Sequence, residues 1–331
     1  MAINVLKPGL QTTIQDLGRR GYQGIGVIVS GAMDHYSFRI ANLLVGNDQG
    51  EGALEITMTG PTLEFTSDTL ISLTGADLGP VIDGRPVKMG RPVAIKAGSI
   101  LTFSSYKSGA RTYLAVSGGF DIDPVMGSKS TNLRGQFGGF NGRALAKGDH
   151  LETNEPTEFG HMQMQLIFKQ GARSFGQSKW FIADAIVHPN QIKKPIRMMA
   201  GLHYGEFTPE SKFDFYKQSF EITLNSDRMG YRLQGPKIEL KEPLEIISEV
   251  VNFGTIQVPN EGNPIILMVD HQTAAGYPII GQVSYADLPR LAQLRPGDKV
   301  RFEEIDVETS ERLFYQMERD IERIAIAING Q

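Results

Sequence analysis

The sequence predicts a mainly β protein with two domains, for three reasons. At 331 residues, the chain is longer than a single hydrophobic core usually supports. Its 37 glycines and 17 prolines indicate the many turns that separate short strands in barrels and sandwiches. Short apolar or alternating runs bounded by Gly, Pro, Asp or Ser predict strands. In the first half, the runs that we expect to form strands are 62–65, 70–73, 100–103 and 112–116.

A four-residue turn recurs three times, each time directly before a predicted strand. The turns lie at 96–99, 146–149 and 295–298. The third residue of each turn is a glycine, which readily adopts the positive φ that such turns require. We therefore expect positive φ at Gly98, Gly148 and Gly297.

Helices are predicted at only a few places. Asp34 is an expected helix N-cap, and Thr208 followed by Pro209 is an expected helix start. Ser284 is expected to cap a short apolar helix, and a last helix is expected from about Glu308. The apolar stripe of this last helix, which we interpret as core or as a contact between subunits, consists of Leu313, Met317, Ile321 and Ile324.

The pattern that predicts helices and strands is weakest at residues 152–160, and we expect the domain boundary there. We predict an N-terminal domain at 1–155 and a C-terminal domain at 156–331 that includes the last helix. A faint internal repeat agrees with two domains. Short motifs at 30–33, 60–65 and 147–149 are followed, in the same order, by similar motifs at 226–229, 235–240 and 296–298. Duplication of one barrel-like unit is one explanation. Chance recurrence of common Gly-Pro and Gly-Asp turn pairs is the other.

Composition excludes several classes of function. The chain has no cysteine, which removes disulfides and thiolate metal sites and fits a reducing compartment. It has no apolar run long enough to cross a bilayer and no amino terminus like a signal peptide, so we expect a cytoplasmic protein. The net charge is −4 and residues of both signs are interspersed, so the sequence shows no concentration of positive charge that would indicate binding to nucleic acid or to a membrane surface. The expected partner is a small molecule or another protein.

Familiar catalytic motifs are also missing. The segment 171–179 has the glycine spacing of a phosphate-binding loop, but Gln177 stands where the lysine is needed. No two histidines have the i, i+4 spacing of a metal-binding helix, so no metal site is predicted. No Gly-x-Ser-x-Gly word is present, which argues against a self-contained serine hydrolase.

The sequence contains four clusters of polar residues. Three of them each have a functional and a structural interpretation. The segment 12–19 is either a binding loop or a self-satisfied turn. The loop 127–135 could contact an anion through backbone N–H groups and Arg134, or be a mobile surface loop. The segment 225–232 could be catalytic, or hold a structural ion pair between Asp227 and an arginine.

The fourth polar cluster gives the most specific indication of a functional site. An apolar strand at 265–269 runs directly into the polar residues that begin with Asp270 and include Gln272, Thr273 and Tyr277. Polar side chains at the end of an interior strand are held on a rigid support at the rim of a sheet, where binding sites are common. The alternative is that Asp270 only caps a turn.

The sequence resembles a known family at several long motifs that occur in a fixed order. They lie at 7–18 (Lys-Pro-Gly-Leu-Gln-Thr-Thr-Ile-Gln-Asp-Leu-Gly), 30–34, 39–47, 118–120, 226–233 and 272–278. Together they resemble the family of carboxyltransferase-like (allophanate hydrolase subunit 2-like) proteins that includes KipA and the C subunit of 5-oxoprolinase. The resemblance implies two cyclophilin-like β-barrel domains with a few short helices and a C-terminal helix.

The resemblance also implies an activity. It is that of the C subunit in an ATP-dependent 5-oxoprolinase complex, which converts 5-oxo-L-proline, ATP and water to L-glutamate, ADP and phosphate. A five-membered lactam is a resonance-stabilised amide, so water attacks it slowly unless it is first activated by phosphorylation or carboxylation. ATP is expected at the level of the complex, because this chain has no nucleotide motif. No biotinylation Met-Lys-Met word is present, so no covalent biotin site is expected.

Site residues follow from combining the clusters with this chemistry. Asp270 is the expected proton acceptor, and Arg228 is the expected clamp for the substrate carboxylate. The other expected catalytic residues are Gln272, Thr273 and Tyr277, and the expected substrate-binding residues are Asn132, Arg134 and Tyr231.

Partners and alternatives are implied as well. The expected partners are a sister chain like KipI or the B subunit of 5-oxoprolinase, and a lactam-utilisation protein like the A subunit of that enzyme. The chain is expected to be inactive alone. One alternative function is a KipA-like regulatory protein that binds and antagonises a KipI-like inhibitor of a histidine kinase. Another is a carboxyltransferase-like subunit that acts on a urea-type amide.

Overall fold

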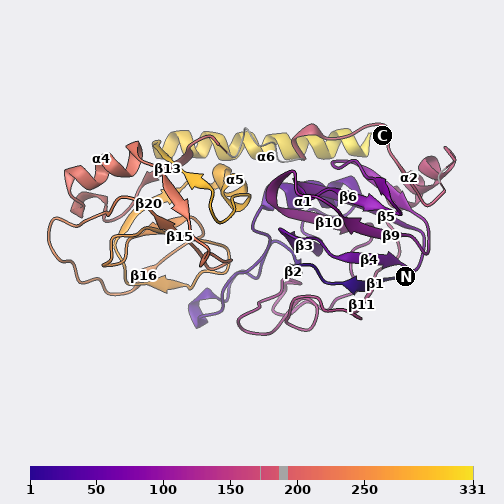
Figure 1. Cartoon of the computed structure of the whole chain (residues 1–331), viewed down its shortest axis with the longest axis horizontal. Helices are drawn as coiled ribbons and strands as arrows, with labels where there is room; N and C mark the ends of the chain where they lie inside the picture. The colour runs from indigo at the N-terminus through magenta and orange to yellow at the C-terminus, as the bar shows by residue number, and fades with distance from the viewer. Residues whose placement is uncertain (172, 186–192, 331) are drawn as a thin grey trace. The chain divides into compact units, whose positions relative to one another are not determined.

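The computed structural model describes residues 1–171, 173–185 and 193–330, and the fold is mainly β, as predicted. The chain divides into two compact units, and Figure 1 labels many of their helices and strands. Unit 1 comprises the described residues of Met1–Arg19, Asp34–Pro189 and Asp320–Gln331, and unit 2 those of Arg20–Met33 and Asn190–Arg319.

This division differs from the expected boundary at 155/156. The described residues that follow this boundary, up to 185, include a strand that pairs in unit 1, where Phe175 lies opposite Ile95. The weakly patterned stretch 152–160 is therefore not the end of unit 1, because further elements of unit 1 follow it. That the two units are separate folding domains stays a prediction.

Unit 1 is built from two antiparallel sheets that each have six strands within the described residues. Their strand orders are β11-β1-β4-β9-β6-β7 and β12-β8-β5-β10-β3-β2. The strands are β1 (Ala2–Lys7), β2 (Gln11–Gln15), β3 (Ala53–Thr57), β4 (Thr62–Phe65), β5 (Thr69–Asp77), β6 (Pro80–Ile82), β7 (Arg85–Pro86), β8 (Pro92–Ile95), β9 (Ile100–Phe103), β10 (Ser108–Val116), β11 (His150–Glu152) and β12 (Phe175–Gln177). Strands β4 and β9 have the predicted bounds. Strands β5 and β10 are longer than predicted because each is an interior strand, paired on both edges and buried along nearly all its length.

Among the described residues of unit 1, two α-helices begin. The first, α1 (His35–Leu44), has the predicted cap, because the Asp34 carboxylate accepts a hydrogen bond from the Ser37 N–H at 2.8 Å. The second, α2 (Glu158–Phe168), was not predicted. Its N-cap is Thr157. Met162 and Leu166 are exposed on this helix, so apolar residues lie on two faces and blur the stripe that identifies an amphipathic helix.

Unit 2 is built on one sheet that has eight strands within the described residues. The order is β21-β14-β15-β18-β17-β20-β13-β22, and β13 and β22 form the parallel pair of an otherwise antiparallel sheet. A two-stranded ribbon, β16-β19, is separate. The strands are β13 (Ile196–Ala200), β14 (Phe220–Ile222), β15 (Gly230–Gln234), β16 (Glu249–Val250), β17 (Thr255–Gln257), β18 (Ile265–Leu267), β19 (Ala274–Ala275), β20 (Ile279–Val283), β21 (Lys299–Val300) and β22 (Phe302–Glu304).

The helices of the second half begin near their predicted positions. Thr208 caps α4 (Pro209–Lys217), as predicted, and α6 (Val307–Asn329) begins one residue before Glu308. Ser284 makes no side-chain cap, which corrects the prediction, because its hydroxyl lies 2.9 Å from the Ser310 hydroxyl. A 3₁₀ helix (Tyr285–Asp287) separates Ser284 from α5 (Leu288–Ala292). Elsewhere in the described ranges, 3₁₀ helices form at Gln23–Ile25, Ala183–Ala185 and Tyr204–Glu206.

The three recurring turns form as predicted. Gly98, Gly148 and Gly297 have φ of 81°, 91° and 89°. In each turn the N–H of the fourth residue donates to the carbonyl of the first, at 3.1, 3.2 and 2.9 Å respectively. No helix in the described ranges combines the length and the apolarity needed to cross a membrane.

Candidate functional site

The sheet of unit 2 brings together two of the predicted polar clusters, the segment 225–232 and the residues that begin with Asp270. Strands β15 and β18 are antiparallel, with Gly230 opposite Leu267. The pairing continues beyond the strands, because the Asp270 N–H donates to the Arg228 carbonyl at 2.8 Å. Asp270 and Arg228 therefore lie side by side, although they are 42 residues apart in the chain.

Their side chains form a buried ion pair. Arg228 Nε donates to Asp270 Oδ2 at 2.7 Å, and Arg228 NH2 lies 3.3 Å from Asp270 Oδ1. The same NH2 group donates to the Gly31 carbonyl at 2.7 Å. Arg228 is 5% exposed and Asp270 is 7% exposed, so water screens this pair poorly. The geometry fixes the Asp270 carboxylate firmly.

This geometry bears on two interpretations from the sequence. Asp270 does more than cap a turn, since both of its carboxylate oxygens face Arg228. Asp227, the partner considered for a structural ion pair, instead accepts backbone hydrogen bonds from Met229 and Gly230 at 2.8 and 3.2 Å. Arg228 already donates to protein acceptors through two of its nitrogens, and this favours a role in holding Asp270 in place.

His271 is a neighbouring titratable group that was not among the predicted site residues. Its Nδ1 lies 2.7 Å from the Gln272 carbonyl, and since a carbonyl only accepts, Nδ1 carries the proton. Burial lowers the pKa of His271, and the hydrogen bond to Gln272 and the charge of Asp270 offset part of this effect. The neutral ring therefore has Nε2 as a proton acceptor near pH 7. Its position directly after Asp270 was the available signal in the sequence.

The other predicted residues of this loop are more accessible. Gln272 is exposed, Thr273 is half-buried and Tyr277 is 42% exposed. The Thr273 carbonyl accepts from the Val251 N–H at 3.3 Å, beside the ribbon formed by β16 and β19. These side chains belong to the same loop as Asp270, at the rim of the sheet that the sequence predicted.

Tyr231 lies in the hydrophobic core of unit 2. It is 3% exposed, and its hydroxyl is 3.3 Å from the Leu294 carbonyl. Alternation along β15 explains this burial, because Arg232, the next residue, is exposed.

Unit 1 contains a second polar cluster, in which two of the sequence clusters meet. Asp16 Oδ1 accepts from the Ser128 hydroxyl at 2.8 Å, and Asp16 Oδ2 accepts from the Lys129 N–H at 2.6 Å. Ser130 also donates to Asp16, and Arg19 donates to the Ser130 carbonyl. The segments 12–19 and 127–135 are thus parts of one buried network. The sequence alone does not connect the two segments, because nothing local links residues this far apart.

Asn132 and Arg134 lie in unit 1, whereas the other six predicted site residues lie in unit 2. Asn132 is 5% exposed, and its side-chain oxygen accepts from the Gly135 N–H at 2.8 Å. This contact closes a tight turn. Arg134 is exposed at the tip of that turn.

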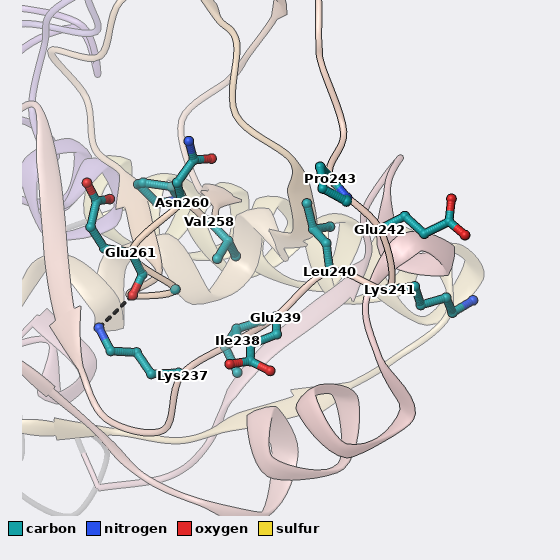
Figure 2. Close-up of a pocket in the computed structure, with 12 residues that line it drawn as sticks. Lys237, Ile238, Glu239, Leu240, Lys241, Glu242, Pro243, Val258, Asn260 and Glu261 are labelled. Carbon is teal, nitrogen blue, oxygen red and sulfur yellow. Dashed lines mark hydrogen bonds between the residues drawn. The ribbon is translucent and has the colours of Figure 1, made fainter.

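A pocket of about 360 Å³ lies elsewhere in unit 2, between the segments 237–243 and 258–262. Figure 2 shows the Lys237 ammonium group directed at the Glu261 carbonyl, to which it donates. Lys241 donates in the same way to the Gly205 carbonyl, so both ammonium groups tie loops together. Among the described residues that line this pocket, none is one of the eight predicted site residues. Within the described part of the chain, no three His, Asp or Glu side chains gather as metal ligands.

Comparison with known families decides the classification. The family model "Carboxyltransferase domain, subdomain A and B" matches residues 25–304. The chain belongs to this carboxyltransferase domain family. The matched region includes Arg228 and Asp270, and the family resemblance drawn from the sequence words is confirmed.

Two relatives within the carboxyltransferase domain family are similar over nearly their whole length. The chain is 37% identical over 311 residues to the C subunit of 5-oxoprolinase from Haemophilus influenzae, covering 94% of each chain. It is 36% identical over 329 residues to the C subunit of 5-oxoprolinase from Escherichia coli K12, covering 99% of each chain. Among solved structures, the Kluyveromyces lactis urea amidolyase matches with a TM-score of 0.83 at 30% identity. That match covers 98% of this chain but only 20% of the urea amidolyase.

Proposed function

We propose that this chain is the C subunit of an ATP-dependent 5-oxoprolinase complex. The observation that carries the proposal is the mutual coverage with two proteins of that name, at 36% and 37% identity and with few unmatched residues on either side. The reaction would convert 5-oxo-L-proline, ATP and water to L-glutamate, ADP and phosphate. A cytoplasmic location stays a prediction.

The buried pair of unit 2 supplies a chemical rationale. Opening the lactam requires water to add to the carbonyl carbon, the ring C–N bond to break and the nitrogen to gain a proton. In our proposal Asp270 accepts and returns the proton, and Arg228 orients Asp270 through the contacts at 2.7 and 3.3 Å. His271 Nε2 is a second proton acceptor, next to Asp270. Gln272, Thr273 and Tyr277 would contact the substrate from the same loop.

ATP and the partner chains complete the proposal. The lactam must be activated, by phosphorylation or by carboxylation, and ATP would supply the free energy at the level of the complex. We propose two partners, a sister chain like KipI or the B subunit of 5-oxoprolinase, and a lactam-utilisation protein like its A subunit. Each of the two relatives is named as one lettered subunit of an enzyme, which supports a multi-subunit assembly.

A second candidate function is a carboxyltransferase-like reaction on a urea-type amide. The similarity to the urea amidolyase structure, with a TM-score of 0.83, favours it. The small share of that protein that the chain matches, 20%, argues for the first proposal.

One experiment distinguishes the two candidates. The chain is co-expressed with the products of neighbouring genes, the complex is purified, and ATP-dependent release of glutamate from 5-oxo-L-proline is measured. Reactions without ATP, and reactions with urea in place of 5-oxo-L-proline, are run in parallel. Glutamate release that requires ATP supports the proposal. ATP hydrolysis stimulated by urea but not by 5-oxo-L-proline would contradict it.

A further inference from the structure

Ser30 has an unusual backbone conformation for its position. Its φ is 57°, in the left-handed region that favours glycine. Five other non-glycine residues in the described ranges have positive φ, namely Met58, Asp83, Met126, Gln136 and Asn141. Those five are half-buried or exposed, whereas Ser30 is 1% exposed. A strained residue in the interior is held in place by its surroundings, and such residues concentrate at functional sites.

The Ser30 side chain is unusual too. Its hydroxyl oxygen is buried and has no hydrogen-bond partner among the described residues. A buried hydroxyl without a protein partner lowers stability, because it has lost its hydrogen bonds to water. Alanine would avoid this loss, and glycine would avoid both this loss and the strained φ. The fold alone therefore does not explain a serine here.

The position of Ser30 links it to the Arg228–Asp270 pair. The next residue, Gly31, accepts a hydrogen bond through its carbonyl from Arg228 NH2 at 2.7 Å. Ser30 is thus one peptide away from the guanidinium group, and all four residues belong to unit 2. A hydroxyl can donate to a carbonyl or carboxylate oxygen, which is the kind of group that an amide-type substrate presents beside a guanidinium.

We propose that Ser30 is a substrate-binding residue of the Arg228–Asp270 site, and that its hydroxyl donates a hydrogen bond to a carbonyl or carboxylate oxygen of the substrate. This inference rests on the proposed function for the identity of the substrate, 5-oxo-L-proline. The strained backbone holds the hydroxyl in place before the substrate binds, so less conformational freedom is lost on binding. The stability lost to the strain and to the buried hydroxyl is the cost of that arrangement.

The test compares Ser30→Ala and Ser30→Gly with the wild type, both in the purified complex and as the isolated chain. We expect kcat/KM for 5-oxo-L-proline to fall about 10- to 100-fold in both variants, mainly through a higher KM. We expect the thermal midpoint of the isolated chain to be unchanged or higher for alanine, and higher for glycine. Ser67→Ala is the matched control, since the Ser67 hydroxyl is also buried without a partner among the described residues but lies in unit 1. It should leave kcat/KM unchanged.

Two results would overturn the proposal. One is kcat/KM close to the wild-type value in both Ser30 variants. The other is a lower thermal midpoint in both, because the hydroxyl would then support the fold. If the wild-type complex releases no glutamate from 5-oxo-L-proline, the proposed function fails, but the thermal midpoints need no substrate. Unchanged or raised midpoints would then still support a ligand role for Ser30, and lowered midpoints would overturn it.

Discussion

Asp270 and Arg228 are joined both through their backbones and through their side chains. The Asp270 N–H donates to the Arg228 carbonyl at 2.8 Å, and Arg228 Nε donates to Asp270 Oδ2 at 2.7 Å. A change to either side chain therefore leaves the backbone contact in place but removes a partner from a buried charge. Loss of stability and loss of catalysis must be measured separately at this site.

Asp270→Asn is expected to lower kcat/KM of the folded complex by about 10²- to 10⁴-fold, because the amide keeps the shape of the carboxylate but accepts no proton. It should also lower the free energy of unfolding of the isolated chain by about 3 kcal/mol, because Arg228 is left buried without its anionic partner. Steady-state kinetics and denaturant unfolding measure the two effects. Near-wild-type kcat/KM with lowered stability would leave Asp270 with a purely structural role.

The double variant Arg228→Gln/Asp270→Asn separates the two effects further. Removing both charges leaves no unpaired ion, so its loss of stability should be smaller than the sum of the two single losses. Its kcat/KM should stay as low as that of Asp270→Asn. Recovery of activity together with stability would show that the pair acts only through the fold.

Asp16→Asn is expected to destabilise unit 1 by about 2–4 kcal/mol. The Asp16 carboxylate accepts from the Ser128 hydroxyl, the Gly18 N–H and the Lys129 N–H, so an amide nitrogen in its place would face a donor. Asp123→Asn, at an exposed aspartate, is the control and should have little effect. Equal unfolding midpoints for the two variants would contradict this account.

His271 predicts how stability depends on pH. Its pKa is lowered in the folded state from a reference value of 6.5, so the unfolded chain binds more protons as the pH falls. The stability due to neutral His271 is therefore complete above about pH 6.5 and is lost as the pH falls toward the folded-state pKa. His271→Asn keeps a donor to the Gln272 carbonyl but does not titrate, so its unfolding free energy should fall less between about pH 7 and pH 5. A His271→Asn slope equal to that of the wild type would refute the assignment.

The isolated chain is expected to be inactive. It has no nucleotide motif in its sequence, and its proposed catalytic groups are a carboxylate and an imidazole that need an activated lactam. Glutamate release from 5-oxo-L-proline and ATP by the purified chain should stay at the background of a reaction without protein. Turnover by the single chain at the rate of the complex would contradict the need for partner chains.

The local features of this protein follow from its amino-acid sequence alone. Asp34 and Thr208 cap the helices α1 and α4 because a short polar side chain meets the free N–H groups of the next turn. Gly98, Gly148 and Gly297 form their turns because glycine tolerates positive φ. These outcomes depend on neighbours within a few residues, so they can be predicted from the sequence.

Which polar groups come into contact depends on the three-dimensional fold. The strand register pairs Arg228 with Asp270 across 42 residues, and the fold joins Asp16 to Ser128 across 112. The burial of Tyr231 and the inclusion of α2 in unit 1 are also consequences of the fold. Such contacts depend on the path of the whole chain and on the packing of buried surfaces, and a short stretch of sequence carries no record of either. The sequence therefore determined the parts of the candidate site, and the fold determined how they combine.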